Sequence, residues 1–121
     1  MATIKPFQGY RPPSDMAGSV SSPPYDVMTS DEARDMAQGN PDSFLRIIKP
    51  EIDFTPENEP KGDSLHKHGA ENLQRYINEG KLIQDENPCL YIYQIKMGGH
   101  MQTGIMAAVS IEEYNKRLIK K

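Results

Sequence analysis

The sequence predicts a mixed α/β (α+β) fold, with a small sheet of three or four strands, a central β-hairpin and two or three helices. Two segments carry helix signals: a capped stretch at about residues 30–38 and a longer one with apolar residues near every 3.6 positions. Residues 90–110 contain two β-prone runs around Gly98-Gly99, as a two-residue hairpin does. We expect this fold to be incomplete without further protein.

The supply of apolar residues is small for a chain of 121 residues. Only 23 residues are Ile, Leu, Val or Phe, close to the level of about 20% below which highly charged chains are disordered. The net charge of −3 is low, however, and the apolar residues are clustered. We therefore predict a fragment of a longer protein with a modest core, which gains by packing against a missing carboxy-terminal part or a homo-oligomer partner.

Charge and hydropathy exclude several classes of protein. We expect no nucleic-acid binding, because a slightly acidic chain lacks the concentrated Lys and Arg surface that phosphates require. We expect no membrane insertion and no signal peptide, because no apolar run is long enough for either. The single cysteine, Cys89, can form no internal disulfide and is expected in a buried strand. A cytoplasmic location follows as the default expectation.

Residues 1–28 are predicted to form a Pro-rich but ordered amino-terminal loop, with residues 29–121 as an α/β subdomain of the same domain. The loop holds five of the ten prolines, which restrict the main chain and its entropy. Ile4-Lys5-Pro6-Phe7 is compatible with a short edge strand, where proline is tolerated.

The first helix is predicted from its ends. Thr29 and Glu32 have the spacing of a capping box, and Gly39 supplies a stop. The next apolar run, residues 44–48, is short, contains two β-branched residues and stops before Pro50, which predicts a strand. The acidic residues 51–62 are expected to be an exposed loop.

A second helix is predicted from Asp63 or Ser64 to just before Gly80. Its apolar stripe contains a glycine, Gly69, which costs helix stability unless it allows close packing. We therefore expect a neighbouring segment to lie against this position. The stripe consists of Leu65, Gly69, Leu73, Tyr76 and Ile77.

The hairpin is predicted in register, with Met97 opposite His100 and Ile92 opposite Ile105. Tyr93 then lies opposite Gly104, which makes a glycine tolerable within a strand. Both faces are rather apolar, so we expect the hairpin to be interior to a sheet or covered on both sides. A last helix is expected to begin near Ser110.

Few residues indicate chemistry. His66 and His68 are two apart, so on a helix they diverge and cannot share one metal ion; we predict no metal site. The sequence has no Gly-rich phosphate motif and no recognisable hydrolase motif.

The remaining candidates lie on the Pro-stiffened loop. Arg11, Ser22, Tyr25 and Asp26 are predicted to bind a ligand, since a rigid loop presents a cation, a hydroxyl, a phenol and a carboxylate. Chemistry alone favours the alternative, in which Ser22 and Asp26 satisfy main-chain groups in turns. No catalytic residue is assigned.

Several segments together resemble a known family. They are residues 2–9 with Arg11-Pro12, Ser22-Pro23-Pro24-Tyr25-Asp26-Val27, residues 40–45, residues 48–52, Tyr91-Ile92-Tyr93 and Gln102-Thr103-Gly104. On these segments the chain is similar to the bacterial domain-of-unknown-function family numbered 1015, over essentially its whole length.

The resemblance implies that members are longer and carry an Asp-Gly-His-His-Arg stretch, which is absent here. That stretch resembles the phosphate-binding signature of the ParB and sulfiredoxin-like superfamily, which includes a free-serine kinase. The implied function is the amino-terminal part of a nucleotide-dependent small-molecule kinase-like enzyme, inactive alone, with ATP and Mg²⁺ bound by the full-length protein. The alternatives are a non-catalytic scaffold or protein-interaction module, and a stable truncated product.

Overall fold

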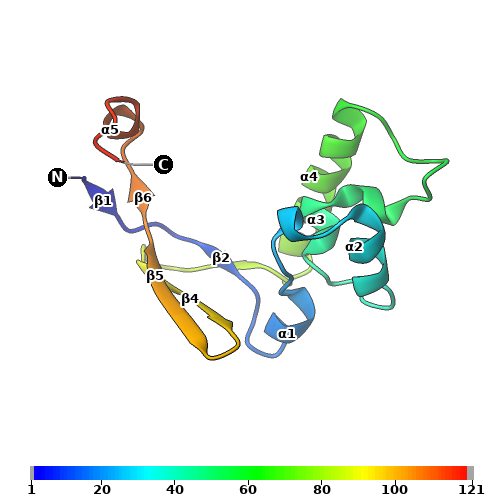
Figure 1. The fold of residues 1–121 in the computed structure, drawn as a ribbon, viewed down its shortest axis with the longest axis horizontal. Helices are drawn as coiled ribbons and strands as arrows, with labels where there is room; N and C mark the ends of the chain where they lie inside the picture. Colours follow the sequence, from blue (N-terminus) through cyan, green and yellow to red (C-terminus); the bar gives the residue numbers. More distant parts are fainter. Residues whose placement is uncertain (1, 120–121) are drawn as a thin grey trace. The chain divides into compact units, whose positions relative to one another are not determined.

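A computed structural model describes residues 2–119. The chain divides into two compact units: residues 11–83, here the helical unit, and residues 1–10 with 84–121, here the strand unit. Two short strands, β2 (Tyr10–Arg11) and β3 (Ile83–Gln84), pair with each other. The predicted mixed α/β class is confirmed, although the strands pair as three two-stranded sheets and not as one sheet (Figure 1).

One long helix and several short helical elements build the helical unit around two small apolar clusters. The first cluster is centred on Ala33 and Leu45, and the second on Val20 and Tyr76. The elements, in chain order, are α1 (Ala17–Val20), the 3₁₀ turn η1 (Tyr25–Val27), α2 (Ser30–Met36), α3 (Leu45–Ile48), the 3₁₀ turn η2 (Pro50–Asp53) and α4 (Asp63–Asn78).

Helix α2 has the predicted capping box. The Thr29 hydroxyl accepts from the Glu32 main-chain N–H, and the Glu32 carboxylate accepts from the Thr29 main-chain N–H. Gly39 follows the helix at φ +72°, a conformation that glycine adopts without steric cost. The first predicted helix is thus confirmed, with α2 ending two residues earlier than expected.

The predicted strand at residues 44–48 is wrong, because this segment forms helix α3. A single helical turn sends Leu45 and Ile48 into the first apolar cluster, while Phe44 and Ile47 pack against the second. A strand would direct alternate residues to two faces and lose this pairing. The next segment is also more ordered than expected, since η2 buries Ile52 in the first cluster.

Helix α4 confirms the second predicted helix and the purpose of its glycine. A Cβ added at Gly69 would lie 2.9 Å from the Ile47 carbonyl oxygen and 3.3 Å from Pro50 Cγ. The absence of a side chain therefore allows α4 to pack closely on α3 and η2. The apolar stripe is only partly buried: Tyr76 is fully buried, whereas Leu73 is 38% exposed.

Short elements of the strand unit hold its two chain segments together. Strands β1 (Ile4–Lys5) and β6 (Ala108–Val109) are antiparallel, which confirms the predicted amino-terminal strand. Cys89, expected to be buried, is half-buried and forms an isolated bridge with Phe7. Ser110 caps α5 (Ile111–Asn115), the expected last helix.

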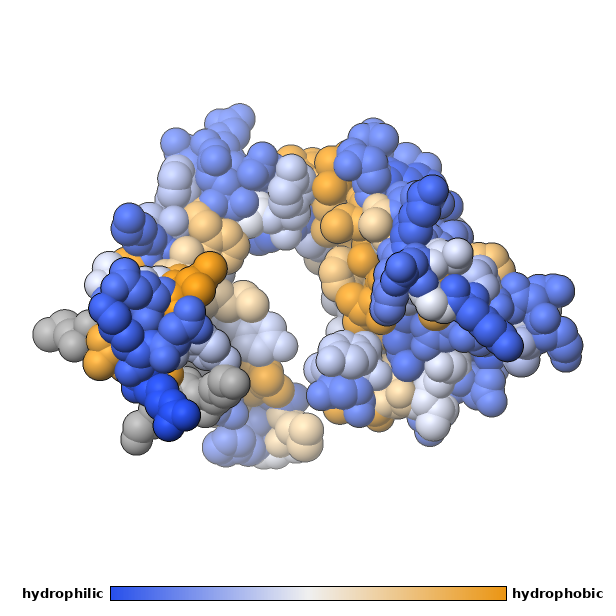
Figure 2. All heavy atoms as spheres, turned by 90° about the horizontal axis from the view of Figure 1, so that it is seen from above, coloured by the Kyte–Doolittle hydropathy of each residue, from blue (hydrophilic) through white to orange (hydrophobic). Residues whose placement is uncertain are grey.

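The hairpin of β4 (Tyr91–Met97) and β5 (His100–Met106) has the predicted register at every pair. Its apolar side chains are exposed on both faces: Ile92 and Met97 are each 78% exposed and Ile105 is 70% exposed. The expected cover is therefore not provided by residues 2–119. Figure 2 shows hydrophobic residues reaching the surface beside hydrophilic ones.

No helix among residues 2–119 is long and apolar enough to span a membrane.

Candidate functional site

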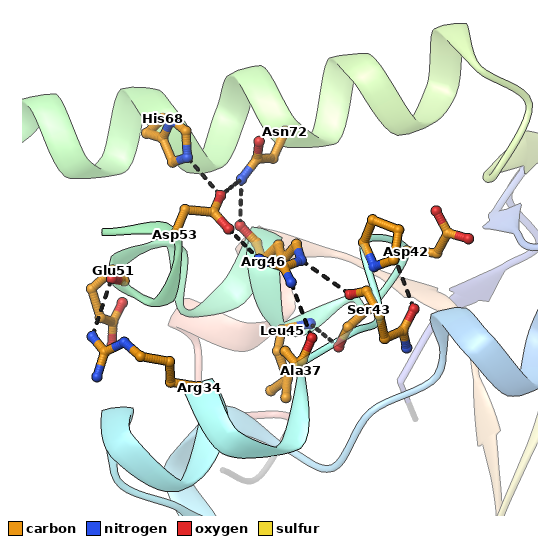
Figure 3. A network of polar contacts seen from close by, with 12 residues as sticks. Arg34, Ala37, Asp42, Ser43, Leu45, Arg46, Glu51, Asp53, His68 and Asn72 are labelled. Carbon is orange, nitrogen blue, oxygen red and sulfur yellow. Dashed lines mark hydrogen bonds and ion pairs between the residues drawn. The ribbon is translucent and has the colours of Figure 1, made fainter. Parts of the chain in front are cut away.

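A pocket of about 450 Å³ lies in the helical unit beside α3, η2 and α4. Its volume is within the usual range for small-molecule sites. Four of the polar side chains that line it, those of Arg46, Asp53, His68 and Asn72, form one hydrogen-bonded network (Figure 3). The lining residues are Pro41, Arg46, Ile52, Asp53, His68, Asn72 and Arg75.

Asp53 is the centre of the network. It ends η2, and its carboxylate accepts hydrogen bonds from Arg46 on α3 and from two residues of α4. The distances are 2.6 Å to Arg46 Nη1, 2.7 Å to His68 Nε2 and 2.9 Å to Asn72 Nδ2. His68 and Asn72 are four residues apart, so the helix places both on one face, from which they point toward Asp53 (Figure 3).

Arg46 joins this network to the loop after α2. Its Nε donates to the Asn40 carbonyl at 3.1 Å and its Nη2 to the Ala37 carbonyl at 3.0 Å. The Arg46 side chain is 21% exposed and that of Asp53 is 18% exposed. An arginine fixed by three partners provides a rigid wall for the pocket rather than a mobile surface charge.

The network also controls the ionisation of Asp53. Burial opposes ionisation of this carboxyl group, but the hydrogen bonds from His68, Asn72 and Arg46 together outweigh it. As a result, the pKa of Asp53 is lowered below its usual value. The carboxylate stays charged at neutral pH and neutralises only part of the positive charge around the pocket.

Arg75 is the second cation at the pocket. It lies one helical turn after Asn72, and its guanidinium carbon is 5.6 Å from the centroid of the Tyr76 ring. Within residues 2–119, no carboxylate forms an ion pair with it. The pocket therefore has two guanidinium groups against one carboxylate, so its positive charge favours an anionic ligand.

A neighbouring pocket of about 370 Å³ shares Arg46 and Ile52 with the first. It is lined by a further arginine, Arg34, whose Nη1 is 2.6 Å from Asp31 Oδ1. The Nε of Arg34 is buried and has no hydrogen-bond partner within the part of the chain that the structure describes. Arg46 thus separates two cavities that both have arginine in their walls.

A family model described as "Protein of unknown function (DUF1015)" matches residues 4–121. The chain belongs to the DUF1015 family. Neither a curated protein nor a solved structure gives a significant match to the chain. Membership of DUF1015 confirms the family resemblance seen in the sequence and states no activity for it.

In this DUF1015 chain, the four predicted ligand-binding residues do not all belong to one element. Arg11 belongs to β2, while Tyr25 and Asp26 are adjacent in η1 and both are exposed. Ser22, three residues before this turn, donates from Oγ to the Pro23 carbonyl at 3.2 Å. Within residues 2–119, the side chains of Tyr25 and Asp26 have no hydrogen bond or ion pair.

Sequence reasoning missed the pocket residues almost completely. The sequence favours an ordinary surface position for His68 over a role as a metal ligand. Its partner is instead Asp53, at 2.7 Å, and His66 is exposed. The only signal in the sequence is the spacing of His68, Asn72 and Arg75 along one helix face.

Proposed function

We propose that this chain is the amino-terminal part of a nucleotide-dependent small-molecule kinase-like enzyme, and that it is not active alone. In this proposal, the pocket beside Asp53 binds the phosphate groups of the nucleotide. The observation that carries the proposal is the guanidinium of Arg75, which lines a pocket with Arg46 and has no carboxylate partner among residues 2–119. Arginine is suited to phosphate because its planar fork matches two oxygens.

The rigid wall supports a binding role. Arg46, His68 and Asn72 are all held by Asp53, so their positions are set before a ligand arrives. Phosphoryl transfer depends mostly on positioning and on cations that neutralise phosphate charge. The pocket can supply this positioning. In this proposal, the full-length protein binds Mg²⁺ and supplies the remaining catalytic groups.

The Pro-stiffened loop is a second part of the proposed site. Tyr25 is 60% exposed in η1, and the adjacent carboxylate of Asp26 has no partner in the described residues. A phenol and a carboxylate in one turn are available for a ligand or for the missing part of the enzyme. We propose that Arg11 and Ser22 complete this wall in the full-length protein.

Calorimetry with ADP tests the proposal. At low ionic strength, we expect a dissociation constant on the order of 1 mM for the chain, since only one wall of the site is present. Arg75→Gln should weaken binding by about tenfold or more, because it removes a charge-assisted contact to phosphate. The matched control is Lys67→Gln, which removes the same charge from an exposed position of α4 outside the pocket.

Two results would count against this function. One is the absence of any heat of binding with ADP up to about ten times the expected dissociation constant. The other is an equal loss of affinity in the two variants, because that would indicate attraction by overall charge and no defined site. A parallel titration with inorganic phosphate shows whether the nucleoside contributes to binding.

A non-catalytic scaffold or interaction module is the second candidate function. One observation favours it: the hairpin exposes apolar side chains on both faces, with Ile92, Met97 and Ile105 each at least 70% exposed. Surfaces of this kind in soluble proteins usually mark a protein–protein contact.

A further inference from the structure

We propose that β5 is a pairing edge for a second copy of this chain, so that two hairpins join into one four-stranded antiparallel sheet. The inference names the partner for the second candidate function, the interaction module, and rests on it. It is independent of the anion pocket, which lies in the other unit.

The outer edge of β5 is open. In residues 2–119, β5 pairs only with β4, and no main-chain hydrogen bond joins its other side to another segment. A two-residue turn makes Met97 and His100 a hydrogen-bonded pair, so Met101, Thr103 and Ile105 direct their N–H and C=O groups outward. An unpaired row of this kind is a template for another strand.

β5 also lacks the features that normally protect such an edge. Its seven residues, His-Met-Gln-Thr-Gly-Ile-Met, include no proline and no Lys, Arg, Asp or Glu. The register with β4 is continuous over seven pairs, so no bulge turns the edge away. Charges, prolines and bulges are the usual means of preventing strand addition.

The edge of β5 is complementary to itself. In an antiparallel pair related by a twofold axis at Thr103, Met101 of one copy faces Ile105 of the other. All seven residues are then paired, with about six new main-chain hydrogen bonds. No charged side chain meets another across the axis.

The same register joins exposed apolar residues into rows. Ile92 lies opposite Ile105 within the hairpin, and the next position across the axis is Met101 of the partner. Lys96 of the partner, which pairs with Met101, ends the row. The twofold axis makes two such rows. They bring together side chains that are largely exposed in a single copy, namely Ile92 (78% exposed), Ile105 (70%) and Met101 (53%).

The outer edge of β4 is a poorer choice. A twofold axis at Gln94 would place the ammonium group of Lys96 opposite the apolar side chain of Ile92. Because each copy contributes one strand of seven residues, we expect the contact to bury less than the roughly 800 Å² per partner of a standard interface, and we expect a dissociation constant on the order of 10 μM.

Sedimentation equilibrium of the chain at about 1 to 500 μM, a range spanning that constant, tests the dimer. Thr103→Lys places two like charges directly opposite each other at the axis, and we expect a monomer throughout. Gln94→Lys is the matched control. Gln94 Nε2 donates a hydrogen bond to Thr103 Oγ1 at 3.3 Å, so each of the two variants loses this hydrogen bond and adds one positive charge to the hairpin. In the dimer the Gln94 positions are three strand spacings apart, so Gln94→Lys should dimerise nearly as the unmodified chain does.

Circular dichroism spectra recorded before each run are to test whether both variants are folded. A chain that stays monomeric at 500 μM would overturn the inference, as would equal effects of the two substitutions or loss of dimer only in Gln94→Lys. A monomeric chain would exclude a second copy as the partner, but it would not exclude an interaction module that binds another protein. The failure of this inference is therefore distinguishable from the failure of the second candidate function.

Discussion

Replacing Asp53 by Asn is expected to lower the free energy of unfolding of the helical unit by about 2–3 kcal/mol. The substitution keeps the size of the side chain but removes the charge that Arg46, His68 and Asn72 share. Arg46 remains mostly buried, with its cation lacking a counter-charge. Loss of one member of a fully buried pair costs more than this, and the value is lower here because both side chains retain some contact with water.

The chain contains a matched control for this experiment. Asp31 and Arg34 form an ion pair at the same distance as Asp53 and Arg46, 2.6 Å, but Asp31 is 87% exposed. Asp31→Asn should therefore change the free energy of unfolding by less than about 0.5 kcal/mol. Urea denaturation followed by the helical circular dichroism signal compares the two variants. Equal effects would contradict the structural importance of the Asp53 network.

The lowered pKa of Asp53 predicts how this difference depends on pH. Below the unfolded value of about 4, the unfolded chain binds a proton at this carboxyl group before the folded chain does. The stabilisation is therefore present above about pH 4 and is lost as the pH falls through the lower, folded value. Asp53→Asn should abolish this contribution, so the stabilities of the variant and the unmodified protein should converge in acid.

Leu45→Ala is expected to lower the free energy of unfolding of the helical unit by about 2–5 kcal/mol. Leu45 is fully buried and packs with Ala33, Ala37 and Ile52 in the first apolar cluster. Its loss would leave a cavity among elements only one or two turns long, which have little other support.

Leu73→Ala on α4 removes the same number of atoms from a side chain that is 38% exposed. We expect it to cost less than about 1.5 kcal/mol, and urea denaturation of both variants measures the difference. If Leu73→Ala were as damaging as Leu45→Ala, the central place of Leu45 in the first apolar cluster would be wrong.

Elements defined by local signals could be predicted from the sequence. Helix α2 has its cap within three residues, and the register of β4 and β5 follows from a two-residue turn. Gly69 was also informative, because a glycine on the apolar stripe of a helix implies a close neighbour, here Ile47 and Pro50.

The error at residues 44–48 has a physical cause. A five-residue apolar run has no measurable period, so β-branched residues and the following Pro50 favoured a strand. Tertiary packing favours the helix, because a helical turn lets the side chains of this segment pack against both apolar clusters. Intrinsic strand preference is weak enough for such packing to override it.

The pocket was not predictable because its members are distant in the sequence. Asp53 meets His68 and Asn72 across 15 and 19 residues, and nothing in the intervening loop indicates that contact. The Pro-stiffened loop, in contrast, was predicted from composition alone, and it stays a prediction. The predictions for Arg11, Ser22, Tyr25 and Asp26 remain predictions.

The most direct test of the proposed function is to observe the arginine side chains themselves by NMR during titration with ADP. The account predicts that the Nε–Hε resonance of Arg75 shifts progressively with ADP, together with that of Arg46, while that of Arg117 in the strand unit stays constant. Constant Arg75 and Arg46 resonances at saturating ADP, or equal shifts at all three arginines, would contradict it.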